Sequence, residues 1–213
     1  MIDGAIETPS LQCFNSLVEH FSDHQFFYYH PAKYGMRDLL ESQRDYDAFI
    51  SLGSASNVED KLNWHQDLAG FLHKKLENKK PVLGICFTHQ LMANYYGAEI
   101  GVCKKDHYST RKFKFKNNWQ NFKQEDQVQV VVAHSQEIKK LPEAFEVLAS
   151  SPDCTFEMIA HKKLPFIGIQ AHPEASMTFI RDNIEVKGIK IDQQDFKDSS
   201  HGGLNIIESF LKM

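Results

Sequence analysis

Cys86 stands where a short apolar segment meets a helical pattern, which is a position suited to a nucleophile. Pro81–Ile85 predicts a buried parallel strand and Phe87–Tyr96 a helix. Such a turn places its residue at the carboxyl edge of a sheet, and a helix N-terminus favours the thiolate. Gly84 suits the tight turn, whereas Thr88 is β-branched where a small residue is expected. A buried structural cysteine would give the same local pattern.

A second group of reactive side chains follows a predicted strand later in the chain. Phe166–Gln170 is apolar and short, and it leads into Ala171, His172, Pro173 and Glu174. Residues two apart on an extended segment point the same way, and proline restricts the backbone between them. His172 and Glu174 can therefore converge, with the carboxylate orienting the imidazole toward a thiol. Together with Cys86 they predict a Cys-His-Glu triad.

The two segments resemble the triad motifs of class I glutamine amidotransferases. They read Gly-Ile-Cys-Phe-Thr-His-Gln over 84–90 and Gly-Ile-Gln-Ala-His-Pro-Glu over 168–174. Leu52-Gly53-Ser54 resembles the oxyanion loop of that family, and 134–150 is similar to the amidotransferase domain of GMP synthetase. The resemblance covers about 45–175. It implies that Cys86 is the nucleophile, His172 the acid and base, and Glu174 the orienting carboxylate.

Further roles come from the same resemblance. It implies an oxyanion hole made by the backbone N–H groups of Gly53 and Phe87. It also implies that Gln90 and the backbone of Ser135 hold the glutamine substrate. His89 lies among aromatic neighbours, so we expect it to serve in packing rather than in catalysis.

The implied reaction is hydrolysis of the glutamine amide through a γ-glutamyl thioester on Cys86, with no metal or organic cofactor. The sequence contains no Ser-Gly-Gly-x-Asp-Ser phosphate loop of the kind found in fused GMP synthetases. A free-standing amidotransferase that delivers ammonia to a separate synthetase or acceptor is therefore favoured. Two alternatives stay open: a γ-glutamyl amide or peptide hydrolase with the same triad, and a binding or regulatory subunit with little turnover. Thr88 in place of the usual glycine supports the last.

Composition limits the class of protein. The chain has 213 residues, 42% of them hydrophobic and 24% charged, with a net charge of −4. These values predict one soluble domain over 1–213 and give no reason to expect nucleic-acid binding. No apolar run is long enough for a membrane span, and the N-terminus lacks a signal pattern, so we expect a cytoplasmic protein. Four scattered cysteines without a CxxC pair argue against disulfides and a zinc ribbon.

The elements that position these residues predict an α/β fold. We expect a flavodoxin-like, mostly parallel central sheet flanked by helices, with mixed or antiparallel strands added in the second half. The expected strands are 1–5, 25–30, 47–52, 81–85, 111–115, 127–133, 145–150, 156–160 and 166–170. The expected helices begin after Ser10 and cover 60–76, 87–96 and 204–213, whereas 192–203 has the composition of a loop.

Three other groups of charged or histidine residues resemble binding or metal sites but have simpler structural interpretations. Arg111–Lys116 alternates basic and apolar residues, which favours a half-exposed strand over a polyanion site. His20 and His24 stand four apart without a third ligand at a suggestive spacing, so we expect surface histidines rather than a metal pair. His65 and His73 share a helix with several acidic residues, which predicts a solvated face.

Overall fold

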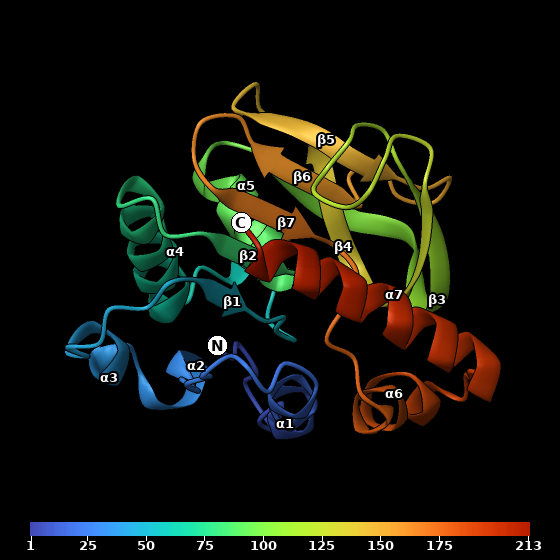
Figure 1. The fold of residues 1–213 in the computed structure, drawn as a ribbon, viewed down its shortest axis with the longest axis horizontal. Coiled ribbons are helices and arrows are strands. Elements are labelled where there is room, and N and C mark those ends of the chain that lie inside the picture. Colours follow the sequence, from blue (N-terminus) through green and yellow to red (C-terminus); the bar gives the residue numbers. More distant parts are fainter.

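The computed structural model describes residues 1–213 and is built around one seven-stranded sheet (Figure 1). Its strands are β1 (Phe49–Ser51), β2 (Val82–Ile85), β3 (Glu99–Phe115), β4 (Gln127–Lys140), β5 (Phe145–Ser150), β6 (Met158–His161) and β7 (Phe166–Ile169). Their order in the sheet is β1-β2-β7-β6-β5-β3-β4. Strand β2 pairs in parallel with both β1 and β7, and all the other pairs are antiparallel. The predicted α/β class, with antiparallel strands from the second half of the chain, is confirmed.

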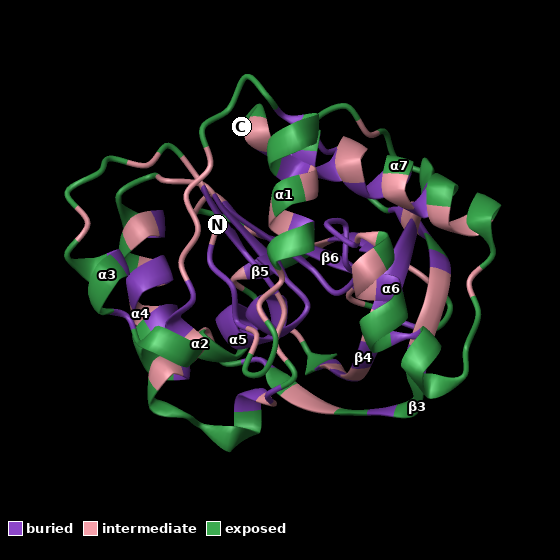
Figure 2. Ribbon diagram, turned by 90° about the horizontal axis from the view of Figure 1, so that it is seen from below, coloured by how far each residue is buried: buried purple, intermediate pink, exposed green.

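Helices cover both faces of this sheet. They are α1 (Leu11–His20), α2 (Pro31–Tyr34), α3 (Arg37–Leu40), α4 (Asn63–Glu77), α5 (Phe87–Tyr95), α6 (Met177–Asn183) and α7 (Gln193–Leu211), with two short 3-10 turns, η1 (Val58–Asp60) and η2 (Glu185–Lys187). Figure 1 shows α7 running across one face of the sheet, and Figure 2 shows its buried stripe turned toward the strands. None of these helices combines the length and apolarity that a membrane span requires.

Alternation along the strands divides the core into two layers. In β2, Leu83 and Ile85 face one side, where they join buried side chains of α1 and α7. Val82 faces the other side and packs with buried side chains of α4 and α5. Because β2 is apolar on both faces, it lies inside the sheet, as its sequence predicts.

The N-terminal strands are shorter than predicted. Of the expected strands 1–5 and 25–30, only Ile2 and Tyr29 take part, and Ile2 forms isolated parallel bridges with Tyr29 and Ser51. The reason lies in Asp3, whose buried carboxylate accepts hydrogen bonds from the N–H groups of Ala5 at 2.9 Å and Ser10 at 2.6 Å. These bonds turn the chain away from the sheet.

The loop predicted over 192–203 is wrong, because these residues form the first half of α7. Asp192 caps the helix by accepting a hydrogen bond from the N–H of Asp195 at 2.8 Å. Gly202 and Gly203 lie inside the helix where it meets other backbone. A Cβ would stand 2.2 Å from the carbonyl oxygen of Gln129 at the first and 2.3 Å from that of Pro173 at the second. These glycines permit close packing and do not end the helix.

Two surface predictions have different outcomes. Residues 111–115 lie in β3 with Arg111, Phe113 and Phe115 buried and Lys112 exposed, so the half-exposed strand is confirmed. The solvated face is wrong for His65, which is 2% exposed and packs against the ring of Phe87. Burial lowers the pKa of His65.

Candidate active site

Cys86 occupies a sharp turn between β2 and α5. Its backbone has φ +47° and ψ −100°, a strained conformation for a residue with a side chain. Gly84 makes the turn possible, because a Cβ there would lie 3.1 Å from both the Phe166 ring and the backbone carbon of Thr88. The strand-turn-helix elbow predicted from the sequence is therefore present.

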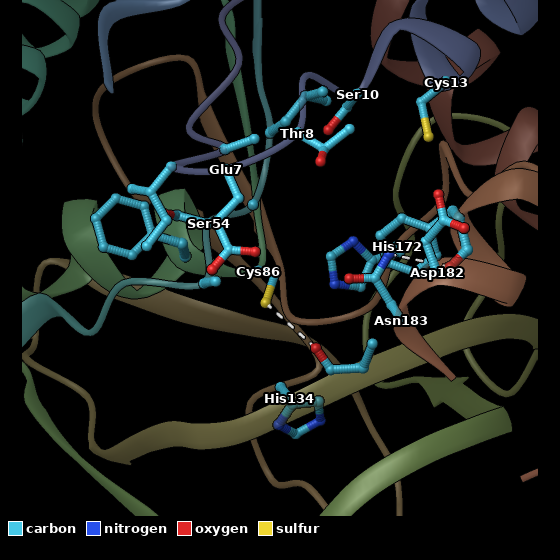
Figure 3. Close-up of a pocket in the computed structure, with 18 of the residues that line it drawn as sticks. Glu7, Thr8, Ser10, Cys13, Ser54, Cys86, His134, His172, Asp182 and Asn183 are labelled. Carbon is cyan, nitrogen blue, oxygen red and sulfur yellow. Dashed lines mark hydrogen bonds between the residues drawn. The ribbon is translucent and has the colours of Figure 1, made fainter. Parts of the chain in front are cut away.

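The thiol of Cys86 lies on the wall of a cavity of about 790 Å³ (Figure 3). The register Ile85↔Ile169 brings the carboxyl ends of β2 and β7 together, and the N–H of Cys86 donates to the carbonyl of Ile169 at 2.8 Å. The side-chain amide of Gln170 donates to the Cys86 Sγ at 3.7 Å. This donor stabilises negative charge on the sulfur.

Sequence reasoning missed Gln170. A signal was available, since Gln170 precedes His172 by two residues on an extended segment and therefore shares its direction. What could not be read from the sequence is the register that brings this amide to the thiol of another strand.

His172 is fixed by both its backbone and its ring. Its N–H donates to the carbonyl of Val131 at 2.8 Å, a bridge that joins the end of β7 to β4. Its Nδ1 donates to Oε1 of Glu174 at 2.9 Å, and both side chains are buried. A carboxylate can only accept, so Nδ1 carries the proton. Nε2 has no hydrogen-bond partner among protein oxygen and nitrogen atoms.

Two opposing effects set the charge of His172. Burial by itself lowers the pKa of the imidazole, but the negative charges of Glu174 and of the Cys86 sulfur outweigh it and raise the pKa to about 10. The imidazolium is therefore the favoured form at neutral pH beside a Cys86 thiolate. The arrangement can hold a thiolate–imidazolium ion pair.

Gly53 and the start of α5 lie beside this pair. A Cβ on Gly53 would stand 3.0 Å from Cε1 of His172 and 3.4 Å from Cβ of Cys86, so only glycine fits without displacement. The Gly53 N–H donates to no protein acceptor. Phe87 is the first residue of α5, where N–H groups have no partner within the helix. The two residues whose N–H groups are expected to bind an oxyanion therefore both lie beside Cys86.

The predicted substrate contacts line the same cavity. Gln90 uses its amide nitrogen for hydrogen bonds to the carbonyl of Gln136 at 2.8 Å and to Oε1 of Gln170 at 3.1 Å. Gln90 therefore also holds the amide that faces Cys86. Ser135 borders the cavity where the register between β3 and β4 is interrupted. Their contact with glutamine stays a prediction.

The remaining histidine and cysteines of interest are buried. His89 is fully buried, and burial lowers its pKa to about 3, which supports the packing role expected of it. Burial raises the pKa of Cys13 and of Cys103 to about 12, and it also raises that of Cys154. All four cysteines are free thiols.

The cavity continues from the thiol toward two segments remote in sequence. Figure 3 shows Glu7 and Ser10 on one side of Cys86 and Asp182 and Asn183 on the other. Its volume lies within the range of about 300–1,000 Å³ typical of small-molecule sites.

A sequence model of the glutamine amidotransferase class-I family matches residues 30–189. The chain belongs to this family. It is 41% identical over 106 residues to the glutamine-hydrolyzing GMP synthase subunit of Methanocaldococcus jannaschii, covering 48% of this chain and 55% of the relative. It is 40% identical over 99 residues to the protein of the same name from Pyrococcus furiosus, covering 46% of this chain and 53% of the relative. The aligned part spans about half the length of these relatives.

The fold is also that of a solved amidotransferase. The crystal structure of a glutamine amidotransferase from Thermotoga maritima superposes with a TM-score of 0.73 over 100% of this chain and 96% of that one, at 16% identity. At this identity the likeness concerns the fold, whereas the family membership rests on the sequence match.

Proposed function

We propose that this protein hydrolyses the side-chain amide of glutamine at Cys86 and supplies the ammonia to a separate synthetase. The observation that carries the proposal is the strained Cys86 beside a buried His172–Glu174 pair, with Gly53, whose N–H donates to no protein acceptor, packed against both. In this proposal Cys86 is the nucleophile, His172 the acid and base, and Glu174 the group that orients it.

In the first half-reaction, the Cys86 thiolate attacks the amide carbon. The N–H groups of Gly53 and Phe87 stabilise the oxyanion of the tetrahedral intermediate. The His172 imidazolium donates its Nε2 proton to the departing nitrogen, and the C–N bond breaks. Ammonia leaves, and a γ-glutamyl thioester and a neutral imidazole remain.

In the second half-reaction, water attacks the thioester. Formation of the thioester has removed the negative charge of the sulfur, which is one of the causes that raise the pKa of His172. The neutral imidazole can therefore accept a proton from the attacking water. Collapse of the second tetrahedral intermediate expels the Cys86 thiolate, releases glutamate and restores the ion pair.

The acceptor is proposed from the relatives. Those from Methanocaldococcus jannaschii and Pyrococcus furiosus carry the name of a glutamine-hydrolyzing GMP synthase subunit. We therefore propose that the ammonia is used by a partner protein that aminates a nucleotide. Gln90 and the backbone of Ser135 are proposed to hold the glutamine.

A γ-glutamyl amide or peptide hydrolase is the second candidate, favoured by one observation. The cavity extends past the triad to the residues before α1 and to α6, with the carboxylates of Glu7 and Asp182 among its lining groups. A substrate with a larger amine than ammonia would occupy this space. Faster turnover of γ-glutamyl amines than of glutamine would identify this function.

The deciding experiment measures glutamate release from glutamine by the purified chain, with and without a candidate synthetase. Cys86→Ser is expected to abolish release, whereas Cys13→Ser is the matched control because Cys13 also lines the cavity. A glutamine-like chloroketone should add once, on Cys86. No release with any partner and an unmodified thiol would contradict the proposal and favour a binding or regulatory subunit.

A further inference from the structure

Thr88 is the residue of the Cys86 elbow that departs from the amidotransferase motif, where a glycine is usual. Its side chain is fully buried and makes two hydrogen bonds. The hydroxyl donates to the carbonyl oxygen of Leu52 at 2.9 Å, and it lies 2.9 Å from Oγ of Ser51. The β-branched side chain is therefore part of a specific polar contact between α5 and the loop after β1.

The contact matters because the carbonyl that accepts from Thr88 shares a peptide group with the N–H of Gly53. The carbonyl of Leu52 and the N–H of Gly53 form one planar, trans peptide unit, in which C=O and N–H point in opposite directions. A hydrogen bond that fixes the carbonyl direction therefore also fixes the direction of the Gly53 N–H.

No other hydrogen bond holds this unit. The carbonyl of Leu52 accepts from Thr88 alone, and the Gly53 N–H donates to no protein group. The ladder between β1 and β2 ends with the pair Ser51↔Gly84. The nearest further restraint is the hydrogen bond from the Leu52 N–H to the carbonyl of Ile2 at 2.8 Å, on the preceding peptide.

We propose that Thr88 is a positioning residue that aims the Gly53 N–H at the oxyanion formed on attack by Cys86. This inference rests on the proposed function, and it adds a residue and a role to it. Thr88 touches neither the substrate nor the thiol in this role, and it acts through the Leu52–Gly53 peptide.

The two hydroxyls also polarise that peptide. Thr88 has one hydroxyl proton, and it is given to Leu52, so the Ser51 hydroxyl is the donor in their mutual bond. A continuous series then runs from Ser51 through Thr88 and the carbonyl of Leu52 to the Gly53 N–H. Hydrogen bonds in such a series strengthen one another, which makes the terminal N–H a better donor to an anion.

The test compares Thr88→Val, which keeps the shape and removes the hydroxyl, with Thr88→Ser, which keeps the hydroxyl. We expect Thr88→Val to lower kcat for glutamine hydrolysis by about 10- to 100-fold with little change in KM, since deleting an oxyanion donor outright costs about 10²- to 10³-fold. Thr88→Ser is expected to stay within about threefold of the wild type. If valine prevents folding at this buried site, Thr88→Ala removes the same hydroxyl from a smaller side chain.

A second measurement distinguishes an effect on the direction of the Gly53 N–H from an effect on the stability of the fold. The aldehyde analogue of glutamine should add to Cys86 as a tetrahedral hemithioacetal whose oxyanion needs the Gly53 N–H. Its inhibition constant is expected to rise in Thr88→Val by the factor lost in kcat, and to recover in Thr88→Ser. Wild-type kcat and wild-type aldehyde inhibition in folded Thr88→Val would overturn the proposal.

The aldehyde measurement also separates this inference from the proposed function. A wild-type chain that binds the aldehyde covalently but releases no glutamate would refute the proposed function, and the comparison of the Thr88 variants would still decide the role of Thr88. A wild-type chain that neither binds the aldehyde nor hydrolyses glutamine would refute both.

Discussion

Gly203 of α7 packs directly on Pro173, the residue between His172 and Glu174 of the proposed triad. A Cβ on Gly203 would lie 2.3 Å from the carbonyl oxygen of Pro173 and 2.8 Å from its Cα. Since real Cβ atoms do not approach backbone this closely, the helix and the triad segment have to separate if any other residue stands there. By packing on Pro173, helix α7 therefore restricts the position of the segment that carries His172 and Glu174.

Gly203→Ala is therefore expected to damage the site as well as the fold. The methyl group has to displace Pro173, and with it the bond from His172 to Glu174, so we expect a loss of about 1–3 kcal/mol in the free energy of unfolding and at least 10-fold in kcat/KM. Chemical denaturation and glutamine hydrolysis measure the two effects.

Gly70→Ala is the matched control, because Gly70 lies inside α4 and a Cβ there would meet nothing within 4 Å. Alanine is favoured over glycine in a helix interior by about 1 kcal/mol, so this variant should be more stable than the wild type with unchanged kcat/KM. Equal stability losses in both variants would contradict the packing argument.

The elbow at Cys86 and the pairing of His172 with Glu174 could be predicted from the sequence because each geometry is local. A strand that turns into a helix at Cys86, and a His-Pro-Glu segment after a strand, each place their side chains within a few residues. Gln170 and Thr88 are different, since their hydrogen-bond partners, Cys86 and Leu52, lie far away in the sequence. The start of α7 could not be predicted in this way, because a glycine that permits close packing inside a helix, such as Gly202 or Gly203, cannot be distinguished in a sequence from one that ends a helix.

Cys86 is expected to be the one thiol that reacts with iodoacetamide at neutral pH. Burial raises the pKa of Cys13 and Cys103 to about 12, so these thiols stay protonated, and Cys154 is buried with a raised pKa as well. Only thiolates alkylate at an appreciable rate. Peptide mass mapping after brief treatment should find one carbamidomethyl group, on Cys86, together with complete loss of activity.

Cys86→Ser provides the control for this measurement, since the folded variant should take up no label. Labelling of Cys13 at the same rate as Cys86 would show that its raised pKa does not keep this thiol protonated. Unfolding in denaturant should expose all four thiols and give four modifications in the wild type.

Glu174→Gln is expected to move the alkaline limb of the pH profile to lower pH. The carboxylate is one of the causes that hold the pKa of His172 near 10, whereas burial lowers it. Without this charge the pKa of the imidazole falls, so the ring loses its proton at a lower pH and can no longer protonate the departing nitrogen. The plot of kcat/KM against pH should therefore decline at lower pH than in the wild type.

In Glu174→Gln, the side-chain amide oxygen at position 174 can still accept the hydrogen bond from Nδ1 of His172. The variant therefore tests the negative charge at position 174 rather than the orientation of the imidazole. Glu185→Gln removes an exposed carboxylate of η2 and should leave the profile unchanged. An unaltered alkaline limb in Glu174→Gln would contradict the assignment of that limb to His172.

Gln170→Leu is expected to slow both alkylation of Cys86 and turnover. Its amide donates to the sulfur at 3.7 Å. A hydrogen bond to a charged group contributes about 1.5–3 kcal/mol, so we expect losses of about 10- to 100-fold. Gln90 keeps its bond to the carbonyl of Gln136 in this variant, so the substrate side of the cavity remains in place. The rate of iodoacetamide uptake and the rate of glutamate release measure the two effects.

Gln129→Leu is the matched control for this amide, because Gln129 is a half-buried glutamine of β4 that donates to Asp195 of α7 instead of to the thiol. Loss of that bond should lower the free energy of unfolding without changing the alkylation rate of Cys86 per folded molecule. If alkylation slows equally in both variants, Gln170 affects the reactivity of Cys86 only by stabilising the folded structure. If it slows only in Gln170→Leu, the amide stabilises the thiolate directly.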